Sequence, residues 1–271
     1  MSATGTADVK ERIAAIFGRA AHAYDTVIPF FATFGQQLVA AAQLSAGERV
    51  LDLACGRGAC LRAAAKAVGP SGVVLGVDLS QPMIAATAAA LRAEGVENAQ
   101  VRVGDAEHLE LAAASFDAVI CGFGVFFFPE PQRALSECRR VLRPGGRFAA
   151  STFTSGRGGY AWAEDVARGT GEDPQPVQSP VRTAEGLENA LRQAGFEQIG
   201  SAACQARFVF ADADAYLAWI WSHAGRRVLE KLDDIGLERY REAAAARLVA
   251  HATEHGFELV QQVHLTLARR P

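Results

Sequence analysis

The chain has 271 residues, half of them hydrophobic, which fits one large domain or one domain with an appendage. Its net charge of −3 disfavours a nucleic-acid partner, and no apolar run is long enough to cross a bilayer, so we expect a cytoplasmic protein without a membrane span. The five cysteines, an odd number with no Cys-x-x-Cys pair, argue against a disulfide framework and against a metal site.

The N-terminal part of the chain has the pattern of helices. Apolar residues recur at near-helical spacing between residues 9 and 44, with Pro29 as a break, and this predicts two or three helices ahead of the first strand. Helices in that position can lie across the ligand crevice of an open α/β sheet. We therefore predict a helical cap at residues 1–44 and a ligand-binding domain at residues 45–271.

Residues 49–61 combine a short apolar run, a Gly-x-Gly turn at Gly56 and Gly58, and an alanine-rich stretch. They predict a strand, a tight turn and a helix, with a backbone that a nucleotide-like ligand can approach. Leu61 stands where the dinucleotide fingerprint has its third glycine, and Asp52 would repel a pyrophosphate but attract an ammonium or sulfonium. A cationic nucleoside is favoured over NAD, although a plain strand-to-helix turn needs the same glycines.

Two further acids follow predicted strands. The β-branched run at residues 73–77 ends in Asp78, where an acid accepts hydrogen bonds from a ribose diol. Asp105 follows a third strand at residues 100–103, and its carboxylate could accept a hydrogen bond from the amine of adenine. The alternatives are a helix cap at Asp78 and a solvated loop acid at Asp105.

Strands and helices go on alternating after this point. A strand at residues 116–121, an amphipathic helix at 132–142 and a strand at 147–153 predict a largely parallel sheet with its ligand at the carboxyl ends of the strands. The phenylalanine-rich residues 123–128 are either core or the wall of an apolar pocket. Residues 154–181, rich in glycine, proline and polar side chains, predict a loop near the substrate mouth.

The last part of the chain predicts a helix at residues 184–194 and strands at 196–210 and 258–268. Two helical stretches interrupt this scheme at about residues 212–256. This helical insertion is either a lid or ordinary core packing around tryptophans such as Trp219.

Four short motifs occur in order along the chain: Leu51-Asp52-Leu53-Ala54-Cys55-Gly56-Arg57-Gly58, Gly76-Val77-Asp78-Leu79-Ser80, Gly104-Asp105-Ala106 and Leu142-Arg143-Pro144-Gly145-Gly146. In this order and spacing they resemble the class I S-adenosylmethionine-dependent methyltransferases, most closely from residue 17 to residue 153. The resemblance implies an α/β fold with a Rossmann-like, doubly wound, mostly parallel seven-stranded sheet. It also implies S-adenosyl-L-methionine as the cofactor, with S-adenosyl-L-homocysteine as its product.

The resemblance further implies which residues hold the cofactor. The glycine turn would hold the methionine moiety, the second acid the ribose, and the third acid the adenine edge, with Tyr24 as a lid residue near the sulfonium. The residues so implied are Asp52, Ala54, Cys55, Gly56 and Gly58 for the methionine moiety, Asp78 and Leu79 for the ribose, Met83 beneath the adenine, Gly104, Asp105 and Ala106 at the adenine edge, and Cys121 and Gly122 on the floor beside the methionine.

Two more motifs bear on the substrate. Phe17-x-x-Ala20-Ala21-x-x-Tyr24-Asp25 and Cys121-Gly122-Phe123-Gly124 are similar to the subgroup that acts on quinones and other small hydrophobic molecules. Val125-Phe126-Phe127 stands where the quinone enzymes usually carry Leu-Arg-Asn, so a more apolar natural-product scaffold, as in antibiotic biosynthesis, is implied. We expect O- or C-methylation of a small apolar molecule. A cyclase or rearrangement enzyme that binds S-adenosylmethionine but keeps the methyl stays open, as do a nicotinamide oxidoreductase and a homodimer.

Methyl transfer from a sulfonium requires alignment of the acceptor and exclusion of water rather than a nucleophilic residue of the protein. If the acceptor is a hydroxyl or an acidic carbon, a general base helps, and His22, His108 and His223 are the candidates. A surface or packing role is the alternative for each of them.

Overall fold

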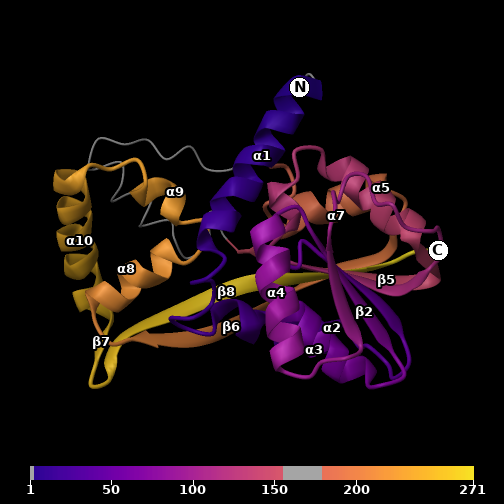
Figure 1. Ribbon diagram of the computed structural model, residues 1–271, viewed down its shortest axis with the longest axis horizontal. Coiled ribbons are helices and arrows are strands. Elements are labelled where there is room, and N and C mark those ends of the chain that lie inside the picture. The colour runs from indigo at the N-terminus through magenta and orange to yellow at the C-terminus, as the bar shows by residue number, and fades with distance from the viewer. Residues whose placement is uncertain (1–2, 155–178) are drawn as a thin grey trace.

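A single mixed sheet lies at the centre of the computed structural model, which describes residues 3–154 and 179–271 (Figure 1). Its strands are β1 (Arg49–Leu53), β2 (Val73–Asp78), β3 (Ala99–Val103), β4 (Phe116–Gly122), β5 (Leu142–Phe153), β6 (Glu197–Phe210), β7 (Ala252–Thr253) and β8 (Gly256–Arg269). They lie in the order β3-β2-β1-β4-β5-β8-β6, and the short β7 pairs with β8. The first five strands in this order are parallel to one another, whereas β8 is antiparallel to both β5 and β6. The expected doubly wound, mostly parallel sheet is confirmed, and among the described residues it has eight strands rather than the expected seven, because the two-residue β7 pairs with β8.

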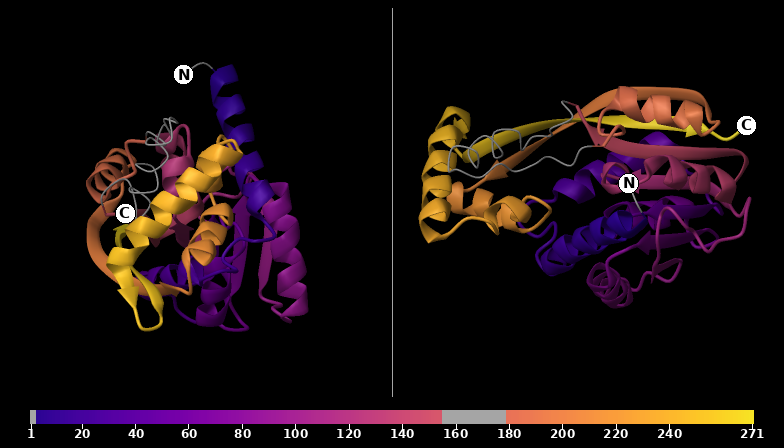
Figure 2. Two further views of the ribbon diagram at one scale, coloured as in Figure 1. Left: turned by 90° about the vertical axis from the view of Figure 1, so that its left-hand side faces the viewer. Right: turned by 90° about the horizontal axis from the view of Figure 1, so that it is seen from above.

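Two groups of helices cover the sheet. The helices are α1 (Ala3–Ala20), α2 (Phe30–Ala42), α3 (Ala59–Val68), α4 (Gln81–Ala93), α5 (Pro131–Val141), α7 (Ala184–Gln193), α8 (Ala213–Trp221), α9 (Arg226–Leu229) and α10 (Asp234–Leu248), with short 3-10 turns η1 (Val125–Phe127) and η2 (Val249–His251). Helices α2 and α3 pack together on one face, and α5 and α7 pack together on the other (Figure 2). Helix α1 begins six residues before the predicted helical pattern at residue 9.

Helix α2 is part of the main core. Phe30, Phe34 and Leu38, spaced four residues apart, form its fully buried face against the sheet. Its first turn is capped by Asp25, whose two carboxylate oxygens accept hydrogen bonds from the backbone N–H groups of Phe31 and Ala32, both at 2.8 Å. The capped helix and the core contacts fix the chain that leads into β1 and its glycine turn.

Strands β6 and β8 extend as a long pair beyond the rest of the sheet and carry α8, α9 and α10 at their far end (Figure 1). These helices occupy the predicted insertion at about residues 212–256. Trp219 of α8 is buried and packs with its ring 5.5 Å from that of Phe30, so this part of the insertion joins the core. The predicted loop at residues 154–181 lies almost wholly outside the described residues.

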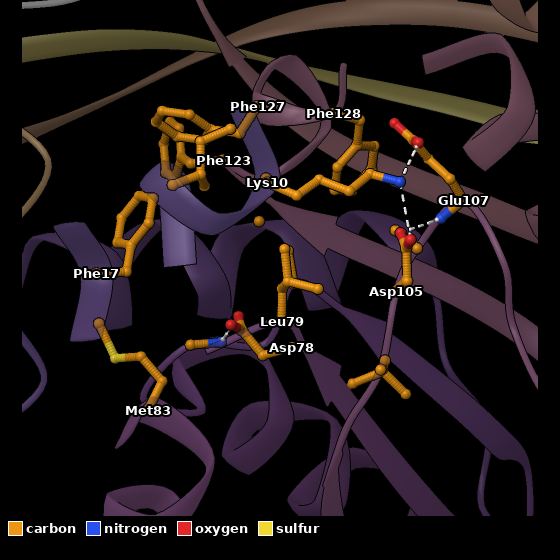
Figure 3. Close-up of a pocket in the computed structure, with 18 of the residues that line it drawn as sticks. Lys10, Phe17, Asp78, Leu79, Met83, Asp105, Glu107, Phe123, Phe127 and Phe128 are labelled. Carbon is orange, nitrogen blue, oxygen red and sulfur yellow. Dashed lines mark hydrogen bonds and ion pairs between the residues drawn. The ribbon is translucent and has the colours of Figure 1, made fainter. Parts of the chain in front are cut away.

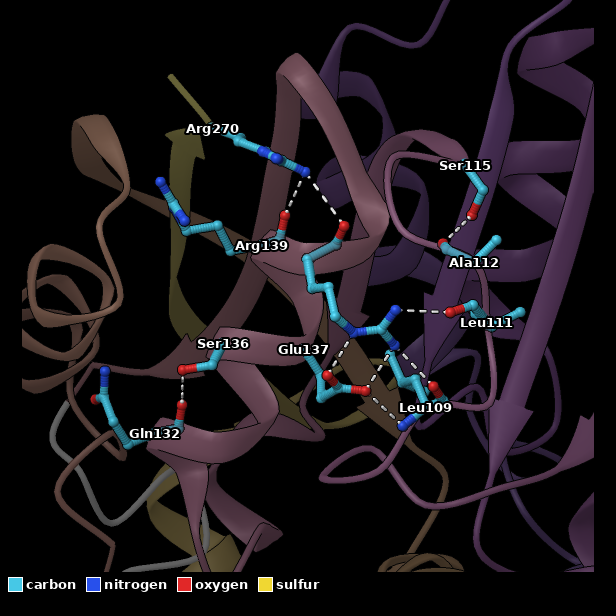
Figure 4. Close-up of polar contacts among 10 residues, drawn as sticks. Leu109, Leu111, Ala112, Ser115, Gln132, Ser136, Glu137, Arg139 and Arg270 are labelled. Atoms are coloured by element: carbon cyan, nitrogen blue, oxygen red, sulfur yellow. Dashed lines mark hydrogen bonds and ion pairs between the residues drawn. The ribbon is translucent and has the colours of Figure 1, made fainter.

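The loop after β3 is tied to α5 by one arginine and one acid. The guanidinium of Arg140 donates to the carbonyls of Leu111 and Leu109 at 2.7 and 2.8 Å, and Glu137 accepts the backbone N–H of Leu109 at 2.8 Å (Figure 4). Arg140 and Glu137 also form an ion pair at 2.6 Å. These contacts hold the loop that carries Asp105 at the carboxyl end of the sheet. Among the described residues, no helix has both the length and the apolarity that crossing a membrane requires.

Candidate cofactor and active site

A cavity opens at the carboxyl ends of the parallel strands, with α1 along one side (Figure 3). The glycine turn, the end of β2, the loop after β3 and the segment after β4 all contribute to its lining. Of the residues implied from the sequence, the following line it: Tyr24, Ala54, Gly56, Asp78, Leu79, Met83, Gly104, Asp105, Ala106 and Gly122. The structure therefore brings the strand-end acids and the glycine turn to one site.

The two glycines of the turn have different tasks. Both have left-handed φ angles, +50° at Gly56 and +77° at Gly58. A Cβ at Gly56 would meet nothing within 4 Å, so this backbone lies open to a ligand. A Cβ at Gly58 would lie 2.9 Å from the guanidinium of Arg62 and 3.0 Å from Thr87, so Gly58 serves packing beneath the turn. Gly58 does not line the cavity.

Asp78 ends β2 and reaches back to the glycine turn. One of its carboxylate oxygens accepts the backbone N–H of Gly56 at 2.9 Å, and the other accepts that of Ser80 at 2.8 Å. Burial raises the pKa of this carboxyl although these N–H groups favour the ionised form. The residue thus joins two ligand-facing turns and keeps spare lone pairs on a carboxylate that lines the cavity, as a ribose acceptor requires.

Asp105 faces a cation from α1. The ammonium of Lys10 lies 2.8 Å from the Asp105 carboxylate and also forms an ion pair with Glu107 (Figure 3). Glu107 is only 4% exposed, and Asp105 accepts its backbone N–H at 2.9 Å. Lys10 and Glu107 lie outside the sequence motifs that indicated the site. The helical spacing of Lys10, Ile13 and Phe17 could have indicated Lys10, because it places all three side chains on one face of α1 along the cavity.

Asp52 lies in a smaller cavity under the glycine turn. It is 1% exposed in the middle of the sheet, and its Oδ2 atom has no hydrogen-bond partner among the described residues. Burial, and secondly the charge of Asp78, raise the pKa of Asp52 well above its ordinary value. A buried carboxylate left unpaired is costly, and an incoming ammonium would satisfy it. The site therefore fits the amino group of the cofactor's methionine moiety.

The two cysteines among the implied cofactor residues, Cys55 and Cys121, have different positions. Cys55 lines the smaller cavity together with Asp52. Cys121 is fully buried in the core cluster, and a Cβ at Gly124 would lie 2.9 Å from its sulfur. Its side chain thus lies beneath the floor rather than on it. Among the described residues, no cluster of three His, Cys, Asp or Glu side chains could hold a metal ion.

The three candidate histidines lie apart from one another. His22 and His108 are exposed, and neither is among the described residues that line the cavity. His223 is 2% exposed, accepts the backbone N–H of Gly225 at 2.8 Å on Nδ1, and packs 4.9 Å from the Trp219 ring. Burial lowers the pKa of His223 to about 3, so its imidazole is neutral at ordinary pH.

An aromatic wall continues the cavity beyond the glycine turn. Phe17 of α1 makes an edge contact with Phe127, with ring centroids 5.1 Å apart, and both line the cavity with Phe123 and Phe128 (Figure 3). Phe123 also belongs to the main core, as do its neighbours Val125 and Phe126. The phenylalanine-rich segment is thus core on one side and pocket wall on the other, which combines the two interpretations left open by its sequence.

Comparison with known proteins agrees with this site. The methyltransferase domain family matches residues 50–146, the span from β1 to the turn within β5. The nocamycin O-methyltransferase of Saccharothrix syringae is 32% identical over 257 residues, which cover 89% of this chain and 90% of that protein. The aklanonic acid methyltransferase DauC of a Streptomyces species is 38% identical over 54% of this chain and 66% of its own length. The demethylmenaquinone methyltransferase of Lactobacillus johnsonii is 41% identical over 39% of this chain and 43% of its own length.

Solved structures share the fold. The YcgJ protein of Bacillus subtilis has a TM-score of 0.60 at 18% identity, covering 88% of this chain and 98% of its own. The 4+2 cyclase SpnF has a TM-score of 0.55 at 26% identity, covering 87% and 79%. A phosphoethanolamine N-methyltransferase of Haemonchus contortus, solved with S-adenosyl-L-methionine, has a TM-score of 0.58 at 19% identity, covering 88% and 52%. With its cavity, its strand-end acids and a relative similar over nearly its whole length, the chain belongs to the class I S-adenosylmethionine-dependent methyltransferases.

Proposed function

We propose that the protein transfers the methyl group to an acidic oxygen of a small, largely apolar natural product. The observation that carries this proposal is the aromatic wall, in which Phe17, Phe123, Phe127 and Phe128 line the same cavity as the cofactor residues. A wall of this kind favours a flat or hydrophobic acceptor, because stacking and edge contacts with aromatic rings add to the burial of apolar area. The aromatic wall offers few hydrogen-bond partners to an acceptor with a polar ring.

The relatives support the same substrate class. The relative that matches over 90% of its own length is named a nocamycin O-methyltransferase, and a second relative is named an aklanonic acid methyltransferase. The demethylmenaquinone methyltransferase of Lactobacillus johnsonii matches over 39% of this chain, against 89% for the nocamycin enzyme. Most of the chain, including most of the parts that would choose the acceptor, is therefore compared with a natural-product enzyme.

The preference for an acidic oxygen follows from the titratable side chains. S-adenosylmethionine, when bound, supplies a methyl group that is already activated on a sulfonium. Among the described lining residues, Lys10, Asp105 and Glu107 are engaged with one another, and Asp78 with the glycine turn. Tyr24 lies beside the aromatic wall, and a phenol is a poor general base at neutral pH. A carboxylic acid, an enol or an acidic phenol would need no base from the protein.

The chain's own contribution is then positioning. Asp52, Asp78 and Asp105 would hold the cofactor along the strand ends, while the aromatic wall aligns the acceptor and keeps water away. Alignment and exclusion of water of this kind can contribute about 7–11 kcal/mol to the lowering of a barrier. No protein nucleophile is needed.

The test is an acceptor panel with methyl-labelled S-adenosylmethionine. Apolar polycyclic compounds that carry a carboxylic acid, enol or phenol are compared with the same compounds in which that group is replaced by an unactivated alcohol. We expect label only in the acidic members, and the label on oxygen. Label on the alcohols, or on nitrogen, would contradict the proposal.

A cyclase or rearrangement enzyme is the second candidate, because the cyclase SpnF shares the fold at 26% identity over 87% of this chain. In the same panel it would give an isomerised product that carries no label. That result would replace methyl transfer as the function.

A further inference from the structure

We infer that Glu230, the residue that follows α9, is a positioning residue that holds α1 against the cavity and thereby sets the rate at which the cofactor enters and leaves. It acts through Arg19, near the C-terminal end of α1. The inference concerns cofactor exchange and does not depend on the acceptor proposed above. Its failure would therefore leave the proposed function standing, and the reverse also holds.

Helix α1 forms one wall of the cofactor cavity. Lys10, Ile13 and Phe17 line the cavity from one face of this helix. Phe17 also touches Phe127 of η1, with ring centroids 5.1 Å apart (Figure 3). The width of the cavity on this side therefore depends on where α1 lies.

The main apolar core does not hold α1 in place. Among the described residues, none of α1 belongs to that core, and Ala20 and Ala21 at its end form a small separate cluster with Met83 of α4. Residues 21–29, which connect α1 to α2, contain no helix or strand, and Asp25 caps the first turn of α2. Movement of α1 about this connection would thus leave α2 and the main core intact.

Two arginines converge on the Glu230 carboxylate. Arg19 donates to both of its oxygens at 2.9 and 2.7 Å, and Arg226 of α9 donates to one of them at 2.7 Å. The guanidinium of Arg226 also lies over the Trp221 ring, 5.7 Å from its centroid. The hydrogen bond from Arg19 is the main cause that lowers the pKa of Glu230, so this carboxylate is ionised at neutral pH. Glu230 thus joins α1 to the helices of the insertion, which lie beside it (Figure 1).

A contact of this kind can open and close. The Arg19 side chain is 48% exposed and that of Glu230 is 25% exposed, and partly exposed ion pairs are weak and are screened by salt. The pair can therefore hold α1 most of the time and still release it. Loss of the Glu230 charge should raise the fraction of open protein both with and without bound cofactor.

The test measures the rates at which S-adenosylhomocysteine binds to and leaves the full-length protein, by surface plasmon resonance. We expect Glu230→Gln to raise the association and the dissociation rate constants together, by about two- to fivefold, and to leave their ratio, the Kd, nearly unchanged. Hydrogen exchange of the α1 backbone amides should become faster in the same variant. Added salt should speed both rates more in the parent than in Glu230→Gln.

Asp214→Asn is the matched control. It removes an ion pair of the same kind, in which Arg241 donates to both Asp214 oxygens at 2.7 and 3.2 Å, but both residues belong to the insertion. Both rate constants should stay as in the parent. An equal rise in this variant would mean that any loosening of the insertion has the effect, and would overturn the specific role of Glu230.

Two further outcomes decide against the inference. Unchanged rates in Glu230→Gln would remove its role, and faster dissociation with an unchanged association rate would mean that the variant only damages the occupied site. If Glu230→Gln does not fold, Arg19→Gln removes the same contact from the side of α1 and should raise both rate constants equally. Parent-like rates in Arg19→Gln would then overturn the inference.

Discussion

The Lys10 ammonium lies 2.8 Å from the Asp105 carboxylate and pairs at the same time with Glu107, so a cation from the first helix closes the end of the cavity at Asp105. Farther along the same helix, Arg19 donates to both carboxylate oxygens of Glu230 at 2.9 and 2.7 Å. Helix α1 is thus tied by ion pairs to the loop after β3 and to the residue that follows α9.

We expect Lys10→Met to lower the free energy of unfolding by about 1–3 kcal/mol, because it leaves the buried Glu107 carboxylate without its cation. Urea unfolding of the variant measures this loss. Glu107→Gln in the Lys10→Met background should restore most of it, since a neutral amide needs no counter-charge. A Lys10→Met protein as stable as the parent would show that the pair carries no net stability.

Asp78→Ala should weaken binding of S-adenosylhomocysteine about 10- to 100-fold, because it removes both a charged acceptor for the ribose and the partner of the Gly56 N–H. Calorimetry measures the affinity, and circular dichroism checks that the variant is folded. A folded variant with unchanged affinity would place the ribose elsewhere.

The raised pKa of Asp52 predicts a dependence of cofactor binding on pH. Only the ionised carboxylate attracts an ammonium, so affinity for S-adenosylhomocysteine should fall as the pH is lowered through that raised pKa. Asp52→Asn should bind more weakly at neutral pH and lose this dependence. Calorimetry across a pH series compares the parent protein with Asp52→Asn. The same change of affinity with pH in both proteins would assign the titration to another group.

The raised pKa of Asp52 also affects stability: the ionised carboxylate favours cofactor binding but destabilises the ligand-free fold. Because its pKa is higher in the folded than in the unfolded state, the ligand-free protein pays for keeping the group ionised at pH values above that folded pKa. Asp52→Asn should therefore raise the Tm of the ligand-free protein at neutral pH. The gain should shrink as the pH falls toward the unfolded pKa, where both states are protonated, and a lower Tm at neutral pH would contradict this account.

His223 makes a separate pH prediction. Its folded pKa of about 3 is below that of the unfolded chain, so the unfolded state gains a proton first and stability is lost as the pH falls below about 6.5. The expected slope is at most about 1.4 kcal/mol per pH unit from this group. Urea unfolding at pH 7.5 and 5.5 should show a smaller difference for His223→Asn than for the parent. Equal differences would mean that His223 is not kept neutral by the fold.

Local sequence patterns predicted the helices, the strands and the acids that follow strands, because these features depend on residues close together in the chain. Helix α3 spans Ala59–Val68, as its alanine-rich pattern indicated. The acids Asp78 and Asp105 line one cavity at the strand ends, and Asp52 lines the smaller cavity under the glycine turn. The start of β5 was predicted too late, because the Pro-Gly-Gly turn is accommodated within the strand, next to a shift in register against β4.

The parts that were missed depend on tertiary contacts. Lys10 meets Asp105 across 95 positions of sequence, and Arg57 meets the Ala21 carbonyl across 36, so neither contact follows from local spacing. Likewise, the burial of Trp219 against Phe30 depends on how the insertion folds back, and its helical pattern fits a lid and a core equally well.

The stoichiometry of methyl transfer tests the central claim most directly. The protein is incubated with methyl-labelled S-adenosylmethionine and an acidic apolar acceptor, and labelled product and S-adenosylhomocysteine are counted together by mass spectrometry. The account predicts one S-adenosylhomocysteine for each labelled product. Conversion of the acceptor with neither label nor S-adenosylhomocysteine would contradict it and assign the fold to chemistry that retains the methyl group.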